Sequence, residues 1–336
     1  MGRVCAPETV DFIQRELGNP AADEVIVQVK ASAICGSDLH IYKGKHPSVS
    51  LPATIGHEFS GDVVAVGSGV KNIDLGQRVT VEPCIVCGVC DACRHGDYGY
   101  CEQISFTYRN GDGAMADYVK VKAPYVYPLP GYLSYEAGAL IEPLSVATHA
   151  VRRADIRLGE NVLVIGAGAI GILVAALCRA SGAGEVVVVD YSAQRLRLAA
   201  EMGATRTVNP GEGQSVEDVV REVTGGTGMD KSIECVGRES TFVQAMECLR
   251  RGGLATIVGI FEEPNITINA MRFINYEVRV QGAQGYCWDF PIALKMTREI
   301  DLEKLVTHTF PLDKLDVALE TCFDRTAGSV KVLLKP

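Results

Sequence analysis

From about residue 160 the chain alternates short aliphatic runs with segments of helical spacing, and this alternation constrains the fold more than any other feature. Runs of four or five aliphatic residues have the length of buried strands, and the segments between them are long enough to form helices. Such alternation is typical of a parallel sheet built from βαβ units. The strand-like runs are VLVIG at 162–166, EVVVVD at 185–190, KSIECVG at 231–237 and LATIVGI at 254–260.

A glycine-rich turn follows the first of these runs. Gly166 would permit a tight turn, Gly168 would let the backbone approach a pyrophosphate, and Gly171 would let the next helix pack closely on the strand. We therefore expect a dinucleotide at the start of this helix, bound by Gly166, Gly168, Ile170 and Gly171. A glycine turn that only packs a helix, in a fold without nucleotide, is the alternative.

The second strand-like run ends in an acidic residue, Asp190, 19 residues beyond Gly171. A carboxylate at this distance can accept hydrogen bonds from the adenosine ribose of a dinucleotide. It would also repel a 2′-phosphate, so the sequence favours NAD over NADP. Arg195 lies nearby and favours NADP instead, because an arginine can accommodate the 2′-phosphate.

Four cysteines with the spacing C-x2-C-x2-C-x7-C predict a structural zinc site formed by Cys87, Cys90, Cys93 and Cys101. A closed cage of four thiolates stabilises a loop and leaves no open position for a substrate. Cys84 continues the three-residue period, so it could replace Cys93 or Cys101. A cluster of thiols without metal is the other alternative.

A second set of ligand types lies upstream of the cysteine cage. Cys35 follows a strand-like segment, and His57 with Glu58 precedes another one. Together with Glu142 of the LIEPLS segment they predict a zinc site with mixed ligands and an open coordination position. Spacing does not distinguish Glu58 from Glu142. One of them can ligate the metal while the other orients it or replaces its water.

The first half of the chain is rich in short strands separated by glycines, at 24–34, 61–70 and 78–83, which indicates a barrel-like β domain. At 336 residues the chain is long enough for two domains. The final strand-like segment, VKVLLKP at 330–336, is expected to return to the first domain. The opening segment MGRVCAPETVDF leaves the start of the barrel unplaced.

Composition excludes several classes of partner. The net charge is −9, with no dense basic run, so neither nucleic acid nor a membrane surface is an expected ligand. The apolar stretches are broken by glycines, and no apolar signal core follows Met1, so we expect a cytoplasmic protein. Five of the 12 cysteines fit zinc positions, and reduced buried thiols account for the others.

The order of these motifs resembles that of the zinc-dependent medium-chain alcohol dehydrogenases over almost the whole chain. The resemblance implies an α/β fold: a GroES-like β-barrel catalytic domain at 1–148 and 286–336, and a Rossmann doubly wound parallel sheet at 149–285 that binds NAD, with the active site between them. The matching motifs are Cys35-Gly36-Ser37-Asp38, Gly56-His57-Glu58, the four-cysteine lobe, Glu142-Pro143, the Gly166 turn and Asp190.

The resemblance also implies roles for individual residues. Zinc acts in such enzymes as a Lewis acid that lowers the pKa of the alcohol. Ser37 would receive the proton of the alcohol, and His40 would pass it towards solvent through the ribose hydroxyls of the nicotinamide. Glu58 and Glu142 complete the expected catalytic set. A hydroxyl that caps a turn and a surface histidine are the structural alternatives for Ser37 and His40.

Substrate choice is the least determined property. Within the family, the Glu-bearing metal site resembles polyol dehydrogenases of the sorbitol type, and also butanediol and L-threonine 3-dehydrogenases. The Arg-Tyr pair of sorbitol-type enzymes is Gly285-Tyr286 here, and a histidine frequent in threonine enzymes is replaced by Cys84. We expect a secondary alcohol, a polyol or sugar alcohol, as substrate, and a dimer or tetramer as the assembly. A catalytically silent NAD-binding protein is the alternative from another class.

Overall fold

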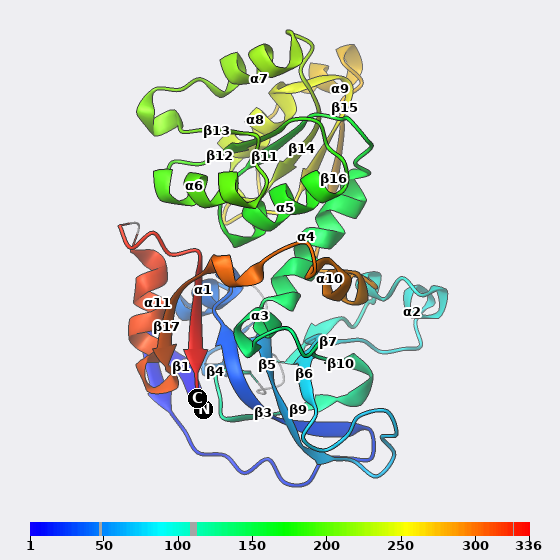
Figure 1. Ribbon diagram of the computed structural model, residues 1–336, viewed down its shortest axis with the longest axis vertical. Helices are drawn as coiled ribbons and strands as arrows, with labels where there is room; N and C mark the ends of the chain where they lie inside the picture. The colour runs from blue at the N-terminus through cyan, green and yellow to red at the C-terminus, as the bar shows by residue number, and fades with distance from the viewer. Residues whose placement is uncertain (47–48, 108–112, 325) are drawn as a thin grey trace. The chain divides into compact units, whose positions relative to one another are not determined.

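The chain divides into two units, each built around its own sheet (Figure 1). The computed structural model describes residues 1–46, 49–107, 113–324 and 326–336. One unit comprises Met1–Glu142 with Asp301–Pro336, and the other comprises Pro143–Ile300. The sequence expectation placed the divisions at 148/149 and 285/286. Helix α4 (Ile141–Ala154) contains the first division, and an uninterrupted helix gives no change of sequence pattern at that point.

The unit Pro143–Ile300 contains a sheet of six parallel strands among its described residues, in the order β13-β12-β11-β14-β15-β16. The first strand, β11, lies in the middle of this sheet. Strands β12 and β13 are added on one side of it and β14, β15 and β16 on the other, so the strand order reverses between β11 and β14. Open sheets of this order bind ligands at the carboxyl ends of the strands beside that reversal. The strands are β11 (Val162–Ile165), β12 (Val186–Val189), β13 (Arg206–Val208), β14 (Met229–Glu234), β15 (Leu249–Ile257) and β16 (Arg279–Gly282).

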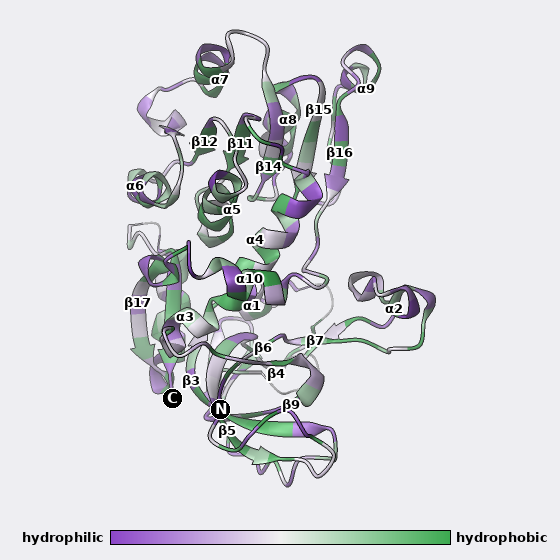
Figure 2. Cartoon of the chain, turned by 45° about the vertical axis from the view of Figure 1, so that its right-hand side comes forward, coloured by the Kyte–Doolittle hydropathy of each residue, from purple (hydrophilic) through white to green (hydrophobic). Residues whose placement is uncertain are grey.

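Helices cover both faces of this sheet. Helices α5 (Ala169–Ala180) and α6 (Ala193–Met202) pack on one face, and α7 (Val216–Thr224) and α8 (Glu239–Glu247) pack on the other. All residues of β11 and β12 are therefore buried, and Figure 2 shows both strands in the green of hydrophobic residues. The unit also contains η4 (Pro210–Glu212), α9 (Met271–Asn275) and α10 (Phe290–Met296).

The other unit is built on a mainly antiparallel sheet, with the order β10-β6-β5-β3-β18-β17 and β9 paired with β3. Strand β3 is central because it pairs with β5, β9 and β18. The C-terminal segment therefore joins the N-terminal unit. The strands are β3 (Glu24–Ala33), β5 (Glu58–Val66), β6 (Arg78–Val81), β9 (Tyr118–Lys122), β10 (Val126–Pro128), β17 (Val306–Pro311) and β18 (Lys331–Lys335).

Alternating apolar residues give this sheet its core. Val25, Val27 and Val29 of β3 are buried against Phe59 and Val63 of β5, as the two-residue period of a strand requires. A second hydrophobic cluster joins residues from both ends of the chain, including Val4, Ile41, Leu315, Leu319 and Leu334.

Shorter elements complete this unit. The opening segment, which the sequence left unplaced, forms the hairpin β1 (Gly2–Ala6) and β2 (Thr9–Phe12), and β1 also pairs with β4 (Ala53–Thr54). The others are α1 (Gly36–Tyr42), β7 (Cys84–Ile85), α2 (Asp91–His95), η1 (Tyr98–Tyr100), β8 (Ser105–Phe106), η3 (Ala123–Tyr125), α3 (Tyr135–Ala139), η5 (Leu302–Leu305), η6 (Leu312–Lys314) and α11 (Leu315–Phe323).

The helices of the described chain are too short or too polar for a membrane crossing. The cysteines in this part of the chain are thiols, without disulfide bonds.

Candidate metal centres and dinucleotide site

Strand pairing brings the mixed ligand set together. Strands β3 and β5 are antiparallel, with Ala33 opposite Glu58. Cys35 follows β3 and is the N-cap residue of α1, while His57 immediately precedes β5. This register gathers Cys35, His57 and Glu58, so that one possible ligand atom from each lies within 4.8 Å of the others.

Asp38 holds both Cys35 and His57 in place. Its carboxylate is fully buried on α1 and accepts hydrogen bonds from the backbone N–H groups of Cys35 at 2.9 Å and Gly56 at 3.1 Å. Its Oδ1 atom also lies 3.8 Å from Nδ1 of His57. One carboxylate therefore fixes the loop that carries the thiol and the loop that carries the imidazole.

Glu58 has a cationic partner from the far end of the chain. Both of its carboxylate oxygens accept hydrogen bonds from the ammonium group of Lys331, the first residue of β18. The side chain of Glu58 is 1% exposed and that of Lys331 is 5% exposed. Burial alone would lower the pKa of Lys331, but the nearby Glu58 and Cys35 favour its charged form, and its pKa is raised above the usual value.

Glu142, the other carboxylate considered from sequence, is buried in the first turn of α4. It lies outside the set formed by Cys35, His57 and Glu58. Its negative charge nevertheless acts on this set. Burial disfavours a charged imidazole, yet the pKa of His57 is raised well above its usual range because Cys35, Asp38 and Glu142 favour a positive charge there.

This environment suits a divalent cation. A thiol, an imidazole and a carboxylate are the ligand types that zinc accepts. Glu58 belongs to this ligand set, Glu142 acts on it electrostatically, and Lys331 offsets part of the negative charge; burial raises the pKa of the third acidic group, Asp38. Buried negative charge is costly unless it is neutralised, and a bound metal ion would neutralise it.

Helix α1 also carries Ser37 and His40, which lie one helical turn apart and therefore share a face. The hydroxyl oxygen of Ser37 is buried, and among the described residues no hydrogen-bond partner lies within reach of it. Because Ser37 comes two residues after Cys35, its hydroxyl belongs to the segment that carries the thiol.

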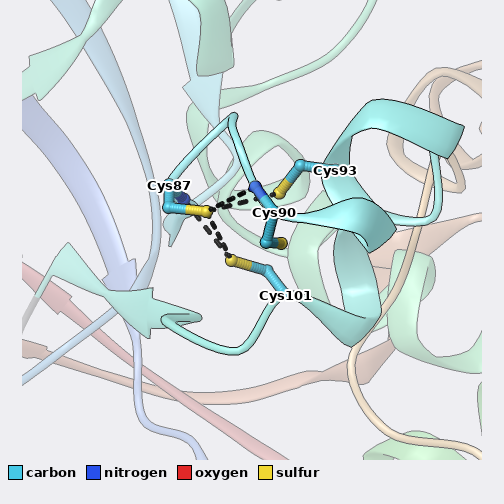
Figure 3. Close-up of side chains that lie close together, drawn as sticks. All are labelled: Cys87, Cys90, Cys93 and Cys101. Atoms are coloured by element: carbon cyan, nitrogen blue, oxygen red, sulfur yellow. Dashed lines mark hydrogen bonds between the residues drawn. The ribbon is translucent and has the colours of Figure 1, made fainter.

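The four-cysteine lobe forms a separate centre (Figure 3). The sulfur atoms of Cys87, Cys90, Cys93 and Cys101 lie within 4.8 Å of one another. Sγ of Cys87 is 3.6 Å from Sγ of Cys101 and 4.0 Å from Sγ of Cys93. Cys84 lies in β7 and outside this set.

Backbone N–H groups prepare this lobe for a cation. Those of Val89 and Cys90 lower the pKa of Cys87 to about 6, so this residue is a thiolate at neutral pH. Desolvation and the neighbouring sulfurs raise the pKa of Cys93 to about 12. Four thiolates this close together would repel one another without a cation. A bound zinc ion would neutralise that repulsion.

The glycine turn between β11 and α5 has the geometry expected for a dinucleotide site. Gly166 has a φ of 100°, in the region that favours glycine. A Cβ atom on Gly171 would lie 1.7 Å from the carbonyl oxygen of Gly166, so helix and turn pack without a side chain between them. A Cβ atom on Gly168, the N-cap residue of α5, would meet open space, as a position approached by a ligand requires.

The carboxylate of Asp190, just after β12, is held at the same edge. It accepts hydrogen bonds from the backbone N–H groups of Ala167 at 2.7 Å and Ser192 at 2.8 Å. Arg195 lies in the first turn of α6, where its backbone N–H group donates a hydrogen bond to the capping hydroxyl of Ser192. Ile170 lies in the first turn of α5 and is partly buried.

Sequence reasoning missed two residues of the mixed centre. Asp38 was part of a recognised motif but had no assigned role, although an acidic residue three positions after Cys35 can bond back to it. Lys331 lies in the apolar strand near the end of the chain, and the sequence pattern gave it no role. A lysine on the buried face of a strand was the available signal, because such residues are rarely buried without a partner.

The fold and the two centres define the class of protein: a dinucleotide-binding type of α/β sheet in one unit, and a β unit with two groups of metal-ligand side chains. Residues 21–131 match the family "Alcohol dehydrogenase GroES-like domain", and residues 169–299 match "Zinc-binding dehydrogenase". Human sorbitol dehydrogenase is 37% identical over 324 residues, which cover 94% of this chain and 90% of that protein.

Two solved structures are also similar. One is 2R,3R-butanediol dehydrogenase from Bacillus subtilis, with a TM-score of 0.91 and 34% identity over 100% of this chain and 99% of that one. The other is a putative zinc-binding dehydrogenase from Sinorhizobium meliloti bound to NADP, with a TM-score of 0.92 and 32% identity over 100% of this chain and 98% of that one. The chain therefore belongs to the zinc-binding medium-chain alcohol dehydrogenase family, in its polyol subgroup. It is accordingly an alcohol oxidoreductase.

Proposed function

We propose that the protein transfers hydride between a secondary alcohol, a polyol or sugar alcohol, and NAD, giving the ketone. The observation that carries this proposal is the convergence of Cys35, His57 and Glu58 in a buried acidic environment. The similarity to sorbitol dehydrogenases supports a polyol as substrate. The similarity to a butanediol dehydrogenase structure keeps 2,3-butanediol as the second candidate.

Cys35, His57 and Glu58 would hold a catalytic zinc ion, with Glu142 near enough to influence its charge. When bound, zinc supplies Lewis-acid chemistry that lowers the pKa of an alcohol. Cys87, Cys90, Cys93 and Cys101 would hold a structural zinc ion. Abundant thiols without disulfides suit a reducing compartment, and we propose a cytoplasmic location.

Ser37 would accept the proton of the alcohol, and His40, on the same face of α1, would pass it on. We expect Ser37→Ala to lower kcat by about a hundredfold, the usual scale of a lost proton-transfer group. The measurement is steady-state turnover across pH. Ser32→Ala is the matched control, because Ser32 is also a buried serine, in the adjoining strand β3, and has no proposed role. An equal loss of kcat in both variants would contradict the relay.

Coenzyme choice follows from Asp190. A carboxylate fixed at the end of β12 repels a 2′-phosphate, so NAD should be preferred to NADP. Asp190→Ala should reduce the ratio of kcat/KM for NAD to that for NADP by at least about tenfold. Arg197→Ala, on the same helix as Arg195, is the control. A wild-type preference for NADP that is lost in Arg195→Ala would contradict this assignment.

The substrate is tested by NADH formation with sorbitol, xylitol, 2,3-butanediol and L-threonine. We expect the highest kcat/KM with a polyol. Activity confined to L-threonine would replace the polyol proposal with an amino-alcohol dehydrogenase. Bound zinc and coenzyme without turnover on a broad alcohol panel would support the silent NAD-binding alternative.

Edge strand β16 supports a homo-oligomer assembled through the sheets of the unit Pro143–Ile300. A strand at the end of a sheet presents hydrogen-bonding groups to a second copy. The preceding helix α9 exposes Met271, Phe273 and Ile274, the last at 73% exposure. We expect Ile274→Glu to shift the mass measured by light scattering from dimer or tetramer towards monomer. Leu158→Glu, at an exposed site before β11, should leave the mass unchanged.

A further inference from the structure

Glu234 is a buried carboxylate at the edge of the sheet where a dinucleotide is expected. It is the last residue of β14, lies opposite Ile165 of β11, and has no exposed surface. Ile165 directly precedes the glycine turn at Gly166. Glu234 therefore lies at the carboxyl end of the strand across the switch point from that turn.

One oxygen of this carboxylate organises the segment Cys235–Gly237, which we call the β14 loop. Its Oε1 atom accepts hydrogen bonds from the N–H groups of Val236 at 2.8 Å and Gly237 at 2.9 Å, and from the hydroxyl of Thr241 at 2.8 Å. The carbonyl oxygen of Glu234 accepts the N–H groups of Val258 and Gly259 after β15. A single residue thus ties two adjacent loops together.

The β14 loop is tightly enclosed on both sides. A Cβ atom on Gly166 would lie 2.7 Å from Cγ2 of Val236. A Cβ atom on Gly259 would lie 2.2 Å from the backbone nitrogen of Gly237 and 2.6 Å from Oε2 of Glu234. A displacement of the loop would consequently press on the glycine turn.

The chemistry of Glu234 argues against a role in packing alone. A buried carboxylate is costly unless hydrogen bonds compensate for its lost hydration, and an apolar residue would fill the same volume at lower cost. Oε1 is satisfied by three donors, whereas no donor within the described residues reaches the buried Oε2 atom. The donors to Oε1 come from the β14 loop and the start of α8, so the charge serves to fix the loop.

We propose that Glu234 is a positioning residue for the coenzyme, acting through the β14 loop. It holds this loop against the Gly166 turn, so that the two segments present one fixed surface to the dinucleotide. The inference rests on the proposed dinucleotide-binding function and adds to it a residue that the glycine turn and Asp190 do not include.

The test compares Thr241→Val with Thr241→Ser. Valine has the shape of threonine but removes the hydroxyl, which bonds to Glu234 and also to the backbone of Arg238 at the start of α8. It should weaken NADH binding about tenfold, the usual effect of losing a hydrogen bond to a charged group. Serine restores the hydroxyl and should keep NADH affinity within about twofold of wild type. Glu234→Gln should also weaken binding, because the loop N–H groups then bond to a neutral acceptor. The dissociation constant is measured by calorimetry on the full chain.

Ser232→Ala separates positioning from stability. Ser232 is buried two residues earlier in β14, and its hydroxyl donates to the carbonyl oxygen of Ala245 on α8 at 2.8 Å. Its loss should lower Tm without changing NADH affinity. The inference is overturned if Thr241→Val and Glu234→Gln behave like Ser232→Ala, that is, if they lower Tm to a similar extent and still bind NADH as tightly as wild type. If the wild-type chain binds neither NADH nor NADPH, the proposed function itself fails, and this inference fails with it.

Discussion

Cys35→Ala is expected to lower kcat/KM for the preferred alcohol by at least about a thousandfold, because an alcohol without Lewis-acid activation ionises only at a pH far above neutrality. Cys35 is the only thiol in its ligand set among the described residues, and thiolate is the strongest zinc ligand of the three types present. The variant should also lose the catalytic one of the two proposed zinc ions, which elemental analysis of the purified protein would measure.

Cys322→Ala is the matched control for this prediction. Cys322 lies on α11 in the same unit, is partly buried, and donates a hydrogen bond to Ala318 within its own helix. It belongs to neither ligand set, so its replacement should leave both zinc content and turnover close to wild type. Full zinc content in Cys35→Ala would show that the metal is held elsewhere.

The parts of the fold that depend on local chemistry could be predicted from sequence. The glycine turn is one example, since its geometry is a property of a single short segment: Gly166 has a positive φ angle and Gly171 is in close contact with it, while the approach of a ligand at Gly168 stays a prediction. The four-cysteine lobe is another, because its sulfurs are separated by short loops and meet within one segment.

The mixed centre is less local, and sequence reasoning reached only part of it. Cys35 and His57 could be paired from their motifs, but their approach depends on the β3–β5 register. The spacing does not show which of Glu58 and Glu142 joins the ligand set, because this depends on where α4 begins relative to β5.

Lys331 is the clearest case of a contact that sequence pattern cannot reveal. It is separated from Glu58 by 273 positions, and it reaches Glu58 because β18 pairs with β3 beside β5. An apolar strand with a lysine at its start is compatible with many environments. Only the strand order places this ammonium group next to a proposed zinc ligand, where it balances part of the local negative charge.

Lys331→Met is therefore expected to have the largest effect on stability. Methionine keeps much of the volume but leaves Glu58 buried without its cation, and breaking a buried ion pair in this way costs about 3–5 kcal/mol. The free energy of unfolding of the zinc-free protein should fall by about that amount. Urea unfolding in the presence of a chelator, followed by circular dichroism, measures it.

Zinc should reduce this penalty, because a divalent ion at Cys35 and His57 supplies positive charge next to the same carboxylate. The double variant Glu58→Gln/Lys331→Met removes both charges and should recover most of the stability of the zinc-free protein, since the cost comes from the unpaired charge rather than from the lost pair. It should not recover zinc affinity if Glu58 is a ligand. Equal stability of zinc-free wild type and Lys331→Met would contradict the pairing, and wild-type zinc affinity in the double variant would identify Glu142 as the carboxylate that completes the site.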